Sequence, residues 1–473
     1  MYKTSLEDTI VAIATPVGSG GIGVVRLSGQ KALAVADKIF VGKGKDRPSE
    51  FKSFTAHYGW VIKKLEIKNQ KSKSKNEIVD EALLTVMRAP RSYTREDIVE
   101  ISCHGGVVSL RAILNLVLEH GPRLAEPGEF TKRAFLNGRI DLAQAEAVLD
   151  IIQSKTDAFL KMSVNQLKGD LTVELESIRE QLSDVYTEME AILNFPEDDV
   201  DGSDRRQLIA KVQKGIKRVG QLVASGEHGK ILREGIKIVI CGRPNVGKSS
   251  LLNVLLKQPR AIVSAIAGTT RDTIEETAQI KGIPFQMIDT AGILEPRDPI
   301  EKEAVKRSRM SVNTADLILF VLDASCPLTG EDKILMAGIK DKNVLIVFNK
   351  IDLGSRLEES RLKKFLLGRR ILKVSAQEKT AIEELEEAIV ENVWHGRIKD
   401  SPELLISNVR HLNALKECAA CLKRAGQSLH DHRPLELASE DVKTAVDRLD
   451  QITGRNIDSD LLDKIFSQFC IGK

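Results

Sequence analysis

The chain has 473 residues, of which 42% are hydrophobic and 4% are aromatic, and its length predicts about three domains packed from aliphatic side chains. Because 70 Lys and Arg oppose 67 Asp and Glu, for a formal charge of +3, overall charge indicates no particular class of partner. The six scattered cysteines suggest no disulfide framework, and neither a secretory signal nor an apolar run of ~20 residues is present. We therefore expect a cytoplasmic protein without a membrane span.

Residues 1–125 predict an α+β domain. Short β-branched runs indicate strands at 10–14, 22–27, 54–62, 82–87 and 98–102, and a helix is expected at 32–40. The basic stretch at 68–75 is either a solvated hairpin tip, which we favour, or a nucleic-acid contact.

Residues 126–234 predict long helices, and helical patterns return at 397–473. Residues 194–199 interrupt the first segment as a loop, and glycines at 225–229 and 234–235 indicate a link to the next domain. Apolar residues at steps of three or four predict a buried helical stripe: Leu160, Val164, Leu167, Leu171, Leu175, Ile178, Leu182 and Val185. Each helical segment has no obvious partner for its apolar face except the other.

Residues 235–396 alternate strand and helix signals, which predicts a parallel sheet with helices on both faces. The apolar runs at 317–322 and 344–348 suit strands buried on both sides. The simplest architecture is therefore a nucleotide-binding domain inserted into a helical domain, which gives four segments: 1–125, 126–234, 235–396 and 397–473.

Residues 242–249 match the phosphate-binding pattern G-x-x-x-x-G-K-[ST]. An apolar strand signal precedes them at 236–240 and a helix signal follows at 250–256. In this context the loop N–H groups and the helix N-terminus point at one anion, so we expect a nucleotide phosphate site.

Two further segments predict the Mg²⁺ and γ-phosphate contacts. Residues 268–272 offer a hydroxyl that could complete a Mg²⁺ shell with Ser249. Residues 289–292 follow another strand signal, so that Asp289 would hold Mg²⁺ through water and the Gly292 amide would face the γ-phosphate.

Two more segments predict guanine recognition. In residues 349–352 the Asp352 carboxylate can accept hydrogen bonds from the N1–H and exocyclic amine of guanine, which adenine cannot offer. Residues 374–376 would place N–H groups against the guanine oxygen. Five motifs in this order predict a Ras-like P-loop GTPase domain, so the fold class is a multidomain α/β and α+β protein with that domain inserted between helices.

The motifs predict GTP contacts at Asn245, Val246, Gly247, Lys248, Ser249, Ser250, Gly268, Thr269, Thr270, Asp289, Thr290, Ala291, Gly292, Asn349, Lys350, Asp352, Ser375 and Ala376. Ile293 and Leu294 are apolar where small GTPases usually hold a water-orienting glutamine, so the attacking water must be placed otherwise. The amide oxygen of Asn245 can coordinate a monovalent cation.

With these motifs in view, the whole chain resembles the bacterial and organellar tRNA-modification GTPases of the MnmE or TrmE family. Outside the GTPase motifs the resemblance rests on residues 8–12, 23–29, 127–137, 141–147 and 469–473. It implies a homodimer formed through an N-terminal folate-binding-like domain. It also implies an FAD-dependent partner, in a heterotetramer or larger complex, that acts with this chain on C5 of the wobble uridine 34 of certain tRNAs. The group installed would be of the aminomethyl type, such as carboxymethylaminomethyl, with a one-carbon unit from 5-formyl- or 5,10-methylene-tetrahydrofolate.

The resemblance also implies roles for individual residues. These are folate contacts at Arg26, Glu100, Arg139 and Lys473; further GTP contacts at Ser264, Ala265, Ile266 and Ala267; Mg²⁺ ligands at Ser249 and Thr270; potassium ligands at Asn245, Ser264, Ile266 and Thr269; and catalytic roles for Glu301 and Lys248. From its local sequence alone, Glu301 is a helix N-terminal acid.

Several residues that could indicate a functional site have a simpler structural interpretation. Cys418 and Cys421 suit a packed helix face better than zinc, and His104 suits a strand-to-helix junction. Cys470, near the C-terminus, is a candidate for a chemical role that stays open. One alternative function is a ribosome-assembly GTPase binding module, although a basic RNA-binding domain after the GTPase motifs is not evident. A second alternative is a folate-dependent methyltransferase that acts alone, but that function would leave the GTPase motifs without a purpose.

Overall fold

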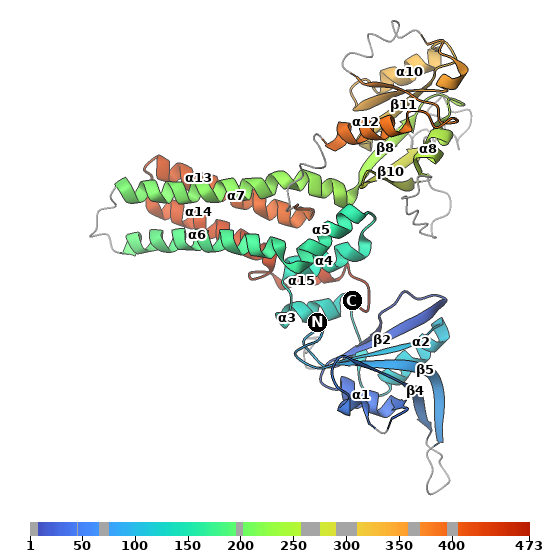
Figure 1. The fold of residues 1–473 in the computed structure, drawn as a ribbon. Helices are drawn as coiled ribbons and strands as arrows, with labels where there is room; N and C mark the ends of the chain where they lie inside the picture. The colour runs from blue at the N-terminus through green and yellow to red at the C-terminus, as the bar shows by residue number, and fades with distance from the viewer. Residues whose placement is uncertain are drawn as a thin grey trace. The chain divides into compact units, whose positions relative to one another are not determined.

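The computed structural model describes residues 8–44, 46–65, 75–194, 202–256, 275–289, 310–357, 369–394 and 405–473. The chain forms two compact units, and its helices and strands are shown in Figure 1. The first unit combines Met1–Leu149 with Gln166–Thr172 and Asp450–Lys473, whereas the second holds Asp150–Asn165 and Val173–Leu449. The protein is therefore a multidomain α/β protein.

The first unit contains a seven-stranded sheet of order β3-β4-β5-β6-β2-β1-β7. Its strands are β1 (Ile10–Ile13), β2 (Gly20–Ser28), β3 (Phe40–Gly42), β4 (Thr55–Leu65), β5 (Lys75–Met87), β6 (Ile98–Gly105) and β7 (Arg123–Leu124). Neighbouring strands are antiparallel except β7, which pairs parallel with β1. The predicted strands and helix are confirmed, whereas the short strands β3 and β7 carry too few residues to show a periodic pattern. The basic stretch at 68–75 lies outside the described residues up to the first residue of β5.

Helices α1 (Ala32–Ile39) and α2 (Val107–Leu118) bury their apolar faces against this sheet. A second apolar cluster joins α3 (Glu129–Leu136) and the start of α4 (Leu142–Gln153) to α15 (Ser459–Phe466). The chain end is tied to the same region, because Gly128 N donates to Cys470 O at 3.3 Å and Phe130 N donates to Lys473 O at 3.2 Å. The last residues are thus part of the folded first unit.

The second unit contains a six-stranded sheet of order β13-β12-β11-β8-β10-β9. Its strands are β8 (Ile236–Cys241), β9 (Glu275–Ile280), β10 (Ile283–Asp289), β11 (Leu317–Asp323), β12 (Val344–Asn349) and β13 (Ile371–Lys373). The sheet is parallel as predicted from β13 to β10, whereas its edge strand β9 pairs antiparallel with β10. Lys281 and Gly282 join the two strands with φ of 48° and 88°, and a two-residue turn with both φ positive gives a tight hairpin.

Both faces of this sheet are covered, as predicted. Helices α8 (Lys248–Leu256) and α12 (Ile382–Trp394) contribute to the apolar cluster on one face, and α10 (Gly330–Gly338) contributes to the other. Every residue of β11 and β12 is buried, which confirms the prediction drawn from their continuous apolar runs.

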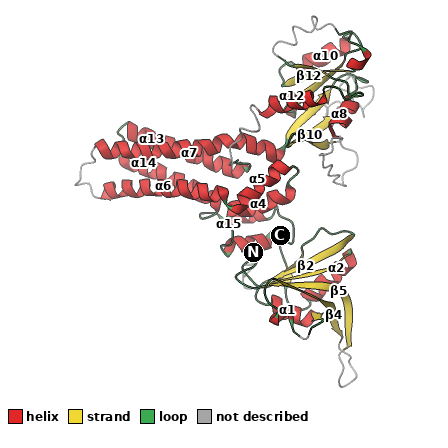
Figure 2. Cartoon of the chain, viewed as in Figure 1, coloured by secondary structure: helices red, strands yellow, loops and turns green. Residues whose placement is uncertain are grey.

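The remaining helices (Figure 2) are α5 (Asp157–Lys168), α6 (Asp170–Asn194), α7 (Gly202–Glu234), α13 (Val409–His430) and α14 (Leu435–Thr453). Helices α7 and α13 lie wholly in the second unit, and α5, α6 and α14 lie mostly in it. The expected pairing of the two helical segments is confirmed, since α7 packs along α13. No described helix has the length and apolar character of a membrane-crossing segment.

The predicted link at 225–229 is wrong, because these residues lie inside α7. The glycines there allow a close approach of the chain near α13. A Cβ at Gly226 would lie 2.5 Å from Leu412 Cδ1, and a Cβ at Gly229 would lie 2.2 Å from Ile406 O. The predicted break at 234–235 is confirmed, since α7 ends at Glu234. The expected loop begins where α6 ends at Asn194, and its residues 195–199 lie outside the described part.

The predicted helical stripe is divided between α5 and α6 at Gly169, whose φ is 101°. From Leu171 to Val185 the stripe is buried as expected, but Leu160 is 39% exposed. Because the break at Gly169 separates the two helices, the three- and four-residue spacing counted through both does not mark the buried face of α5. In α5 it is Phe159 that is buried, and it packs in the same apolar cluster as β8, β9 and β10.

Candidate functional site

The phosphate loop lies between β8 and α8, as the sequence predicts. Its backbone has positive φ at Gly242 (154°), Asn245 (66°) and Gly247 (91°). A Cβ at Gly242 would lie 2.3 Å from Val321 O, and a Cβ at Gly247 would lie 2.3 Å from the Asn349 side-chain nitrogen. Glycine is therefore required at both positions, and the loop is folded tightly at the N-terminus of α8, where an anion is favoured.

Residues 349–350 connect the predicted guanine loop to the phosphate loop. Asn349 Nδ2 donates to Val246 O at 2.9 Å, and Asn349 Oδ1 accepts from Ala376 N at 3.0 Å. Lys350 Nζ donates to Asn245 O at 2.6 Å. Asn349 thus joins three of the predicted GTP segments, while Asp352 follows in the 3₁₀ turn Ile351–Leu353.

The same edge of the sheet carries the other described GTP residues. Asp289 ends β10 in register with Ile240 of the parallel strand β8, so the Asp289 backbone lies beside the start of the phosphate loop. Ser249 and Ser250 lie in the first turn of α8, and Lys248 Nζ donates to Arg243 O at 3.1 Å. Ser375 and Ala376 are buried just after β13. In parallel sheets ligands bind at this carboxyl edge of the strands.

Several predicted site residues lie outside the described part of the chain. They are Ser264, Ala265, Ile266, Ala267, Gly268, Thr269, Thr270, Thr290, Ala291, Gly292 and Glu301. Sequence reasoning also missed one residue at this edge, Asp323, the last residue of β11 and a partner of Lys350. The available signal was a single acidic residue ending an otherwise apolar strand.

A second polar group lies in the first unit, where the structure brings together the four predicted folate residues. Arg26 and Glu100 are opposite each other in β2 and β6, with Arg26 Nε 2.7 Å from Glu100 Oε1. Arg26 Nη1 donates to Gly472 O at 3.2 Å, which places the chain end at this group. Burial, and then the charge of Arg26, lowers the pKa of Lys473.

Two aromatic residues that the sequence reasoning did not assign to a site complete this group. The Arg26 guanidinium carbon lies 5.8 Å from the ring centroid of Tyr93 and 5.6 Å from that of Phe130. The Arg139 guanidinium carbon lies 4.7 Å from the Tyr93 ring, which connects Arg139 to the others. Cations, one carboxylate and aromatic faces therefore meet in one place.

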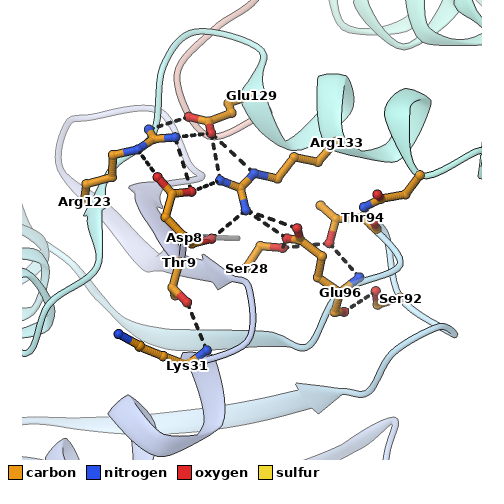
Figure 3. A network of polar contacts seen from close by, with 11 residues as sticks. Asp8, Thr9, Ser28, Lys31, Ser92, Thr94, Glu96, Arg123, Glu129 and Arg133 are labelled. Atoms are coloured by element: carbon orange, nitrogen blue, oxygen red, sulfur yellow. Dashed lines mark hydrogen bonds and ion pairs between the residues drawn. The ribbon is translucent and has the colours of Figure 1, made fainter. Parts of the chain in front are cut away.

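Figure 3 shows the ion-pair network next to this group, centred on Arg133 of α3. The Arg133 side chain is 2% exposed and its guanidinium contacts Asp8 at 2.5 Å, Glu129 at 2.9 Å and Glu96 at 3.1 Å. Arg123 binds Asp8 and Glu129 as well, each at 2.6 Å. The network ties α3, which carries Phe130, to the residues beside β1 and β7.

The oppositely charged groups in this network shift the pKa values of Glu129 and Arg133 toward their ionised forms. Burial raises the pKa of Glu129, but the hydrogen bonds from Arg123, the Glu126 amide and Arg133 outweigh it, so that this pKa lies below its ordinary value. Burial lowers the pKa of Arg133, but its carboxylate partners raise it overall. Glu129 and Arg133 are therefore both ionised near neutral pH.

The structure also places the two cysteines and the histidine for which a structural role was the alternative to a functional one. Cys418 and Cys421 are buried on α13, where burial, and then Cys421, raises the pKa of Cys418 to about 12. Both thiols are buried in the helix, as the packed-face interpretation predicts, and no group of three metal-binding side chains occurs among the described residues. His104 lies in β6 with its Nδ1 2.6 Å from Asp80 Oδ1. Cys470 is an exposed free thiol.

Comparison with known proteins agrees along the whole chain. Residues 142–470 match the family described as the MnmE helical domain, and residues 9–139 match the GTP-binding protein TrmE N-terminus. The chain is 45% identical over 469 residues to the tRNA modification GTPase MnmE of Desulforamulus reducens, covering 99% of this chain and 100% of that protein. It is 45% identical over 468 residues to the corresponding GTPase of Alkaliphilus metalliredigens, and 44% identical over 476 residues to that of Levilactobacillus brevis, with 100% of each relative covered. This similarity disfavours the ribosome-assembly alternative.

Proposed function

Since the chain belongs to the family of tRNA modification GTPases MnmE, and is a GTP hydrolase that acts in tRNA modification, we propose that its GTP turnover drives modification of C5 of wobble uridine 34. The group added is of the aminomethyl type, such as carboxymethylaminomethyl. An FAD-dependent partner protein acts with a homodimer of this chain on certain tRNAs. The observation that carries the proposal is the combination, in one chain, of the nucleotide site in the second unit and the polar group around Arg26 in the first.

The nucleotide site contains the residues that GTP requires. Lys248 supplies positive charge at the phosphates, and the N–H groups of the loop and of α8 point to the same place. Asp352 accepts the two guanine hydrogen bonds that select against adenine. Ser249 and Thr270 would provide hard oxygen ligands for Mg²⁺, and Asp289 would hold the ion through water.

The proposal also includes a potassium ion, which supplies positive charge where other GTPases use an arginine finger. Asn245 is exposed within the loop, and its backbone is held at a φ of 66°, so its amide oxygen can face a cation. Ser264, Ile266 and Thr269 would complete the site, and Glu301 would orient the attacking water.

The polar group of the first unit fits a reduced folate. Folate combines a flat ring system that carries amide-like donors and acceptors with a tail bearing carboxylates. Glu100 can accept from ring donors, whereas Arg139 and Lys473 can pair with carboxylates, and the Tyr93 and Phe130 rings offer apolar faces. Bound 5-formyl- or 5,10-methylene-tetrahydrofolate would supply a one-carbon unit there. Arg26 pairs with Glu100 and donates to Gly472 O, so a bound folate would have residues from distant parts of the first unit beside it.

The experiment that tests the function is mass analysis of wobble nucleosides in tRNA from cells lacking this protein. We expect the C5-modified uridines to disappear and to return with the intact gene, and unchanged wobble uridines would refute the proposal.

Two measurements on the purified homodimer test its parts separately. GTP turnover should be faster in potassium than in sodium, and Asn245→Ala should remove that difference; equal turnover in the two salts would refute the cation site. Titration with 5-formyl-tetrahydrofolate should show binding that Arg26→Ala weakens, and absence of binding by the wild-type protein would refute the folate site.

A further inference from the structure

Asp323 places a carboxylate inside the nucleotide-binding edge of the second sheet. It is the last residue of β11, a strand whose other six residues are all apolar and buried. Its side chain is 8% exposed, and in the parallel pairing Asp323 lies opposite Asn349, the residue before Lys350. A carboxylate at such a position costs free energy of desolvation unless specific partners offset it.

Both oxygens of this carboxylate have partners. Oδ1 accepts from Ser325 N at 2.9 Å and from Ser325 Oγ at 2.6 Å. Oδ2 lies 2.8 Å from Lys350 Nζ. Burial raises the pKa of Asp323, but the bonds from Lys350 and Ser325 lower it by more, so the group is ionised at neutral pH.

Lys350 uses the same ammonium group to reach the phosphate loop. Its Nζ donates to Asn245 O at 2.6 Å, so one nitrogen bridges Asp323 and Asn245. A lysine side chain has four rotatable bonds and loses considerable rotamer entropy when it is held in one place. The Asp323 charge supplies an attraction that keeps the ammonium at the Asn245 carbonyl.

The bridge therefore links the two loops that a guanine nucleotide must contact together. The other link, from Asn349 Nδ2 to Val246 O, is formed by a short, buried side chain and does not depend on Asp323. Loops that are already joined lose less entropy when a ligand binds between them.

We propose that Asp323 is a positioning residue for guanine-nucleotide binding, which holds Lys350 across Asn245 and thereby joins the guanine loop to the phosphate loop before the nucleotide arrives. The inference deepens the GTPase function and rests on guanine recognition by residues 349–352. Asp323 acts through Lys350 and is not itself a catalytic residue.

Asp323→Asn is the sharpest perturbation, because it conserves shape and leaves Oδ1 able to accept from Ser325. It replaces Oδ2 by an NH₂ group that faces the Lys350 ammonium, so an attraction becomes a repulsion. Asp316→Asn is the matched control: Asp316 lies just before β11 at the opposite end of the strand, where its carboxylate accepts from Lys237 N at 2.8 Å.

Dissociation of a fluorescent GDP is measured in the full-length protein for the wild type, Asp323→Asn, Asp323→Glu, Asp316→Asn and Lys350→Ala. Asp323→Asn should speed dissociation about tenfold, as expected for contacting charged residues with coupled effects. Asp323→Glu should speed GDP dissociation less than Asp323→Asn does, because it keeps the charge. The dissociation rate of Asp316→Asn should stay within about twofold of the wild-type rate.

The double variant Asp323→Asn with Lys350→Ala separates positioning from a structural role. If Asp323 acts through Lys350, adding Asp323→Asn to Lys350→Ala should change dissociation by less than about twofold. A tenfold effect that persists in the Lys350→Ala background, or a wild-type rate for Asp323→Asn, would overturn the inference. Failure of the wild-type protein to bind GDP would instead refute guanine recognition itself, and thermal unfolding without nucleotide identifies a variant that does not fold.

Discussion

Replacing Arg133 by methionine should destabilise the first unit strongly while leaving the second unit unchanged. The Arg133 side chain is 2% exposed and pairs with Asp8, Glu96 and Glu129. Methionine fills much of the same volume, so the main change is the loss of the charge. Removing one partner of a buried ion pair costs about 3–5 kcal/mol, because the remaining charge is left buried without compensation.

The structure shows which carboxylate is left without an ion-pair partner. Asp8 and Glu129 retain Arg123 at 2.6 Å, whereas Glu96, whose side chain is 15% exposed, retains the Ser28 hydroxyl, also at 2.6 Å. We therefore expect a loss of about 4 kcal/mol in the opening free energy of this region. Adding Glu96→Gln to Arg133→Met should recover about half of this loss, since the uncompensated charge is removed.

Native-state hydrogen exchange measures this loss segment by segment, which matters because a protein of two units has no single unfolding free energy. Amides of β1 and α3 should exchange about a thousandfold faster in Arg133→Met, while those of β11 and β12 keep the wild-type rate. The matched control is Arg424→Met, whose 59% exposed side chain pairs with Asp441 on the surface and should cost less than about 1 kcal/mol. An acceleration below tenfold in β1 and α3, or an equal acceleration in β11 and β12, would refute the reasoning.

Three other changes give separate tests. Because the pKa of Glu129 lies below 4.5 in the folded protein, its stabilising effect is complete above about pH 4.5 and is lost as the pH falls through the folded pKa. Glu129→Gln should therefore flatten the acid side of thermal unfolding curves measured from about pH 7 to about pH 3, and an unchanged pH profile would contradict this. Gly247→Ala should weaken GDP binding at least about a hundredfold, since its φ is 91° and its new Cβ would lie 2.3 Å from the Asn349 side chain; calorimetric titration that gives a wild-type affinity would exclude this. Phe159→Ala, which removes a ring that is 3% exposed, should cost about 3–5 kcal/mol and lower the unfolding temperature of the second unit; an unchanged temperature would show that α5 does not support the sheet.

The GTP site could be predicted largely from sequence because its chemistry is carried by short contiguous motifs. Residues 242–249 contain the turn glycine, the lysine and the helix start in one stretch, and residues 349–352 contain the guanine-reading carboxylate. Their meeting at one sheet edge follows from parallel strands, since the carboxyl ends of such strands share an edge.

Interactions between distant positions could not be predicted in the same way. Asp323 becomes important because β11 and β12 pair in a register that places it beside Asn349, and an isolated acidic residue does not reveal that register. Arg133 and Asp8 are 125 positions apart, and their contact depends on α3 packing beside β1. The aromatic partners of Arg26 were missed for the same reason.

Glycine accounts for the main differences between the predicted and the observed secondary structure. Gly226 and Gly229 suggested a link, but they lie within α7, where the chain around Ile406 and Leu412 passes too close for a side chain. Gly282 follows Lys281 in a hairpin turn that reverses β9 against β10. A glycine in a sequence indicates a backbone requirement, but the sequence alone does not distinguish a turn from a close approach.

The attachment of the last residues to the first unit has a consequence for synthesis on the ribosome. Leu149 ends the N-terminal part of this unit and Asp450 begins its C-terminal part, so roughly 300 residues are translated between them. At about 5–20 residues per second this takes about 15 to 60 s, during which the β-sheet and α3 exist without α15 and the C-terminal residues. Phe130 N cannot reach Lys473 O, nor Arg26 reach Gly472 O, until residues 472 and 473 have left the ribosome. The group around Arg26 can therefore be assembled only after residues 472 and 473 have been made, and a chain whose translation stops before them has its nucleotide-binding sheet but an incomplete first unit.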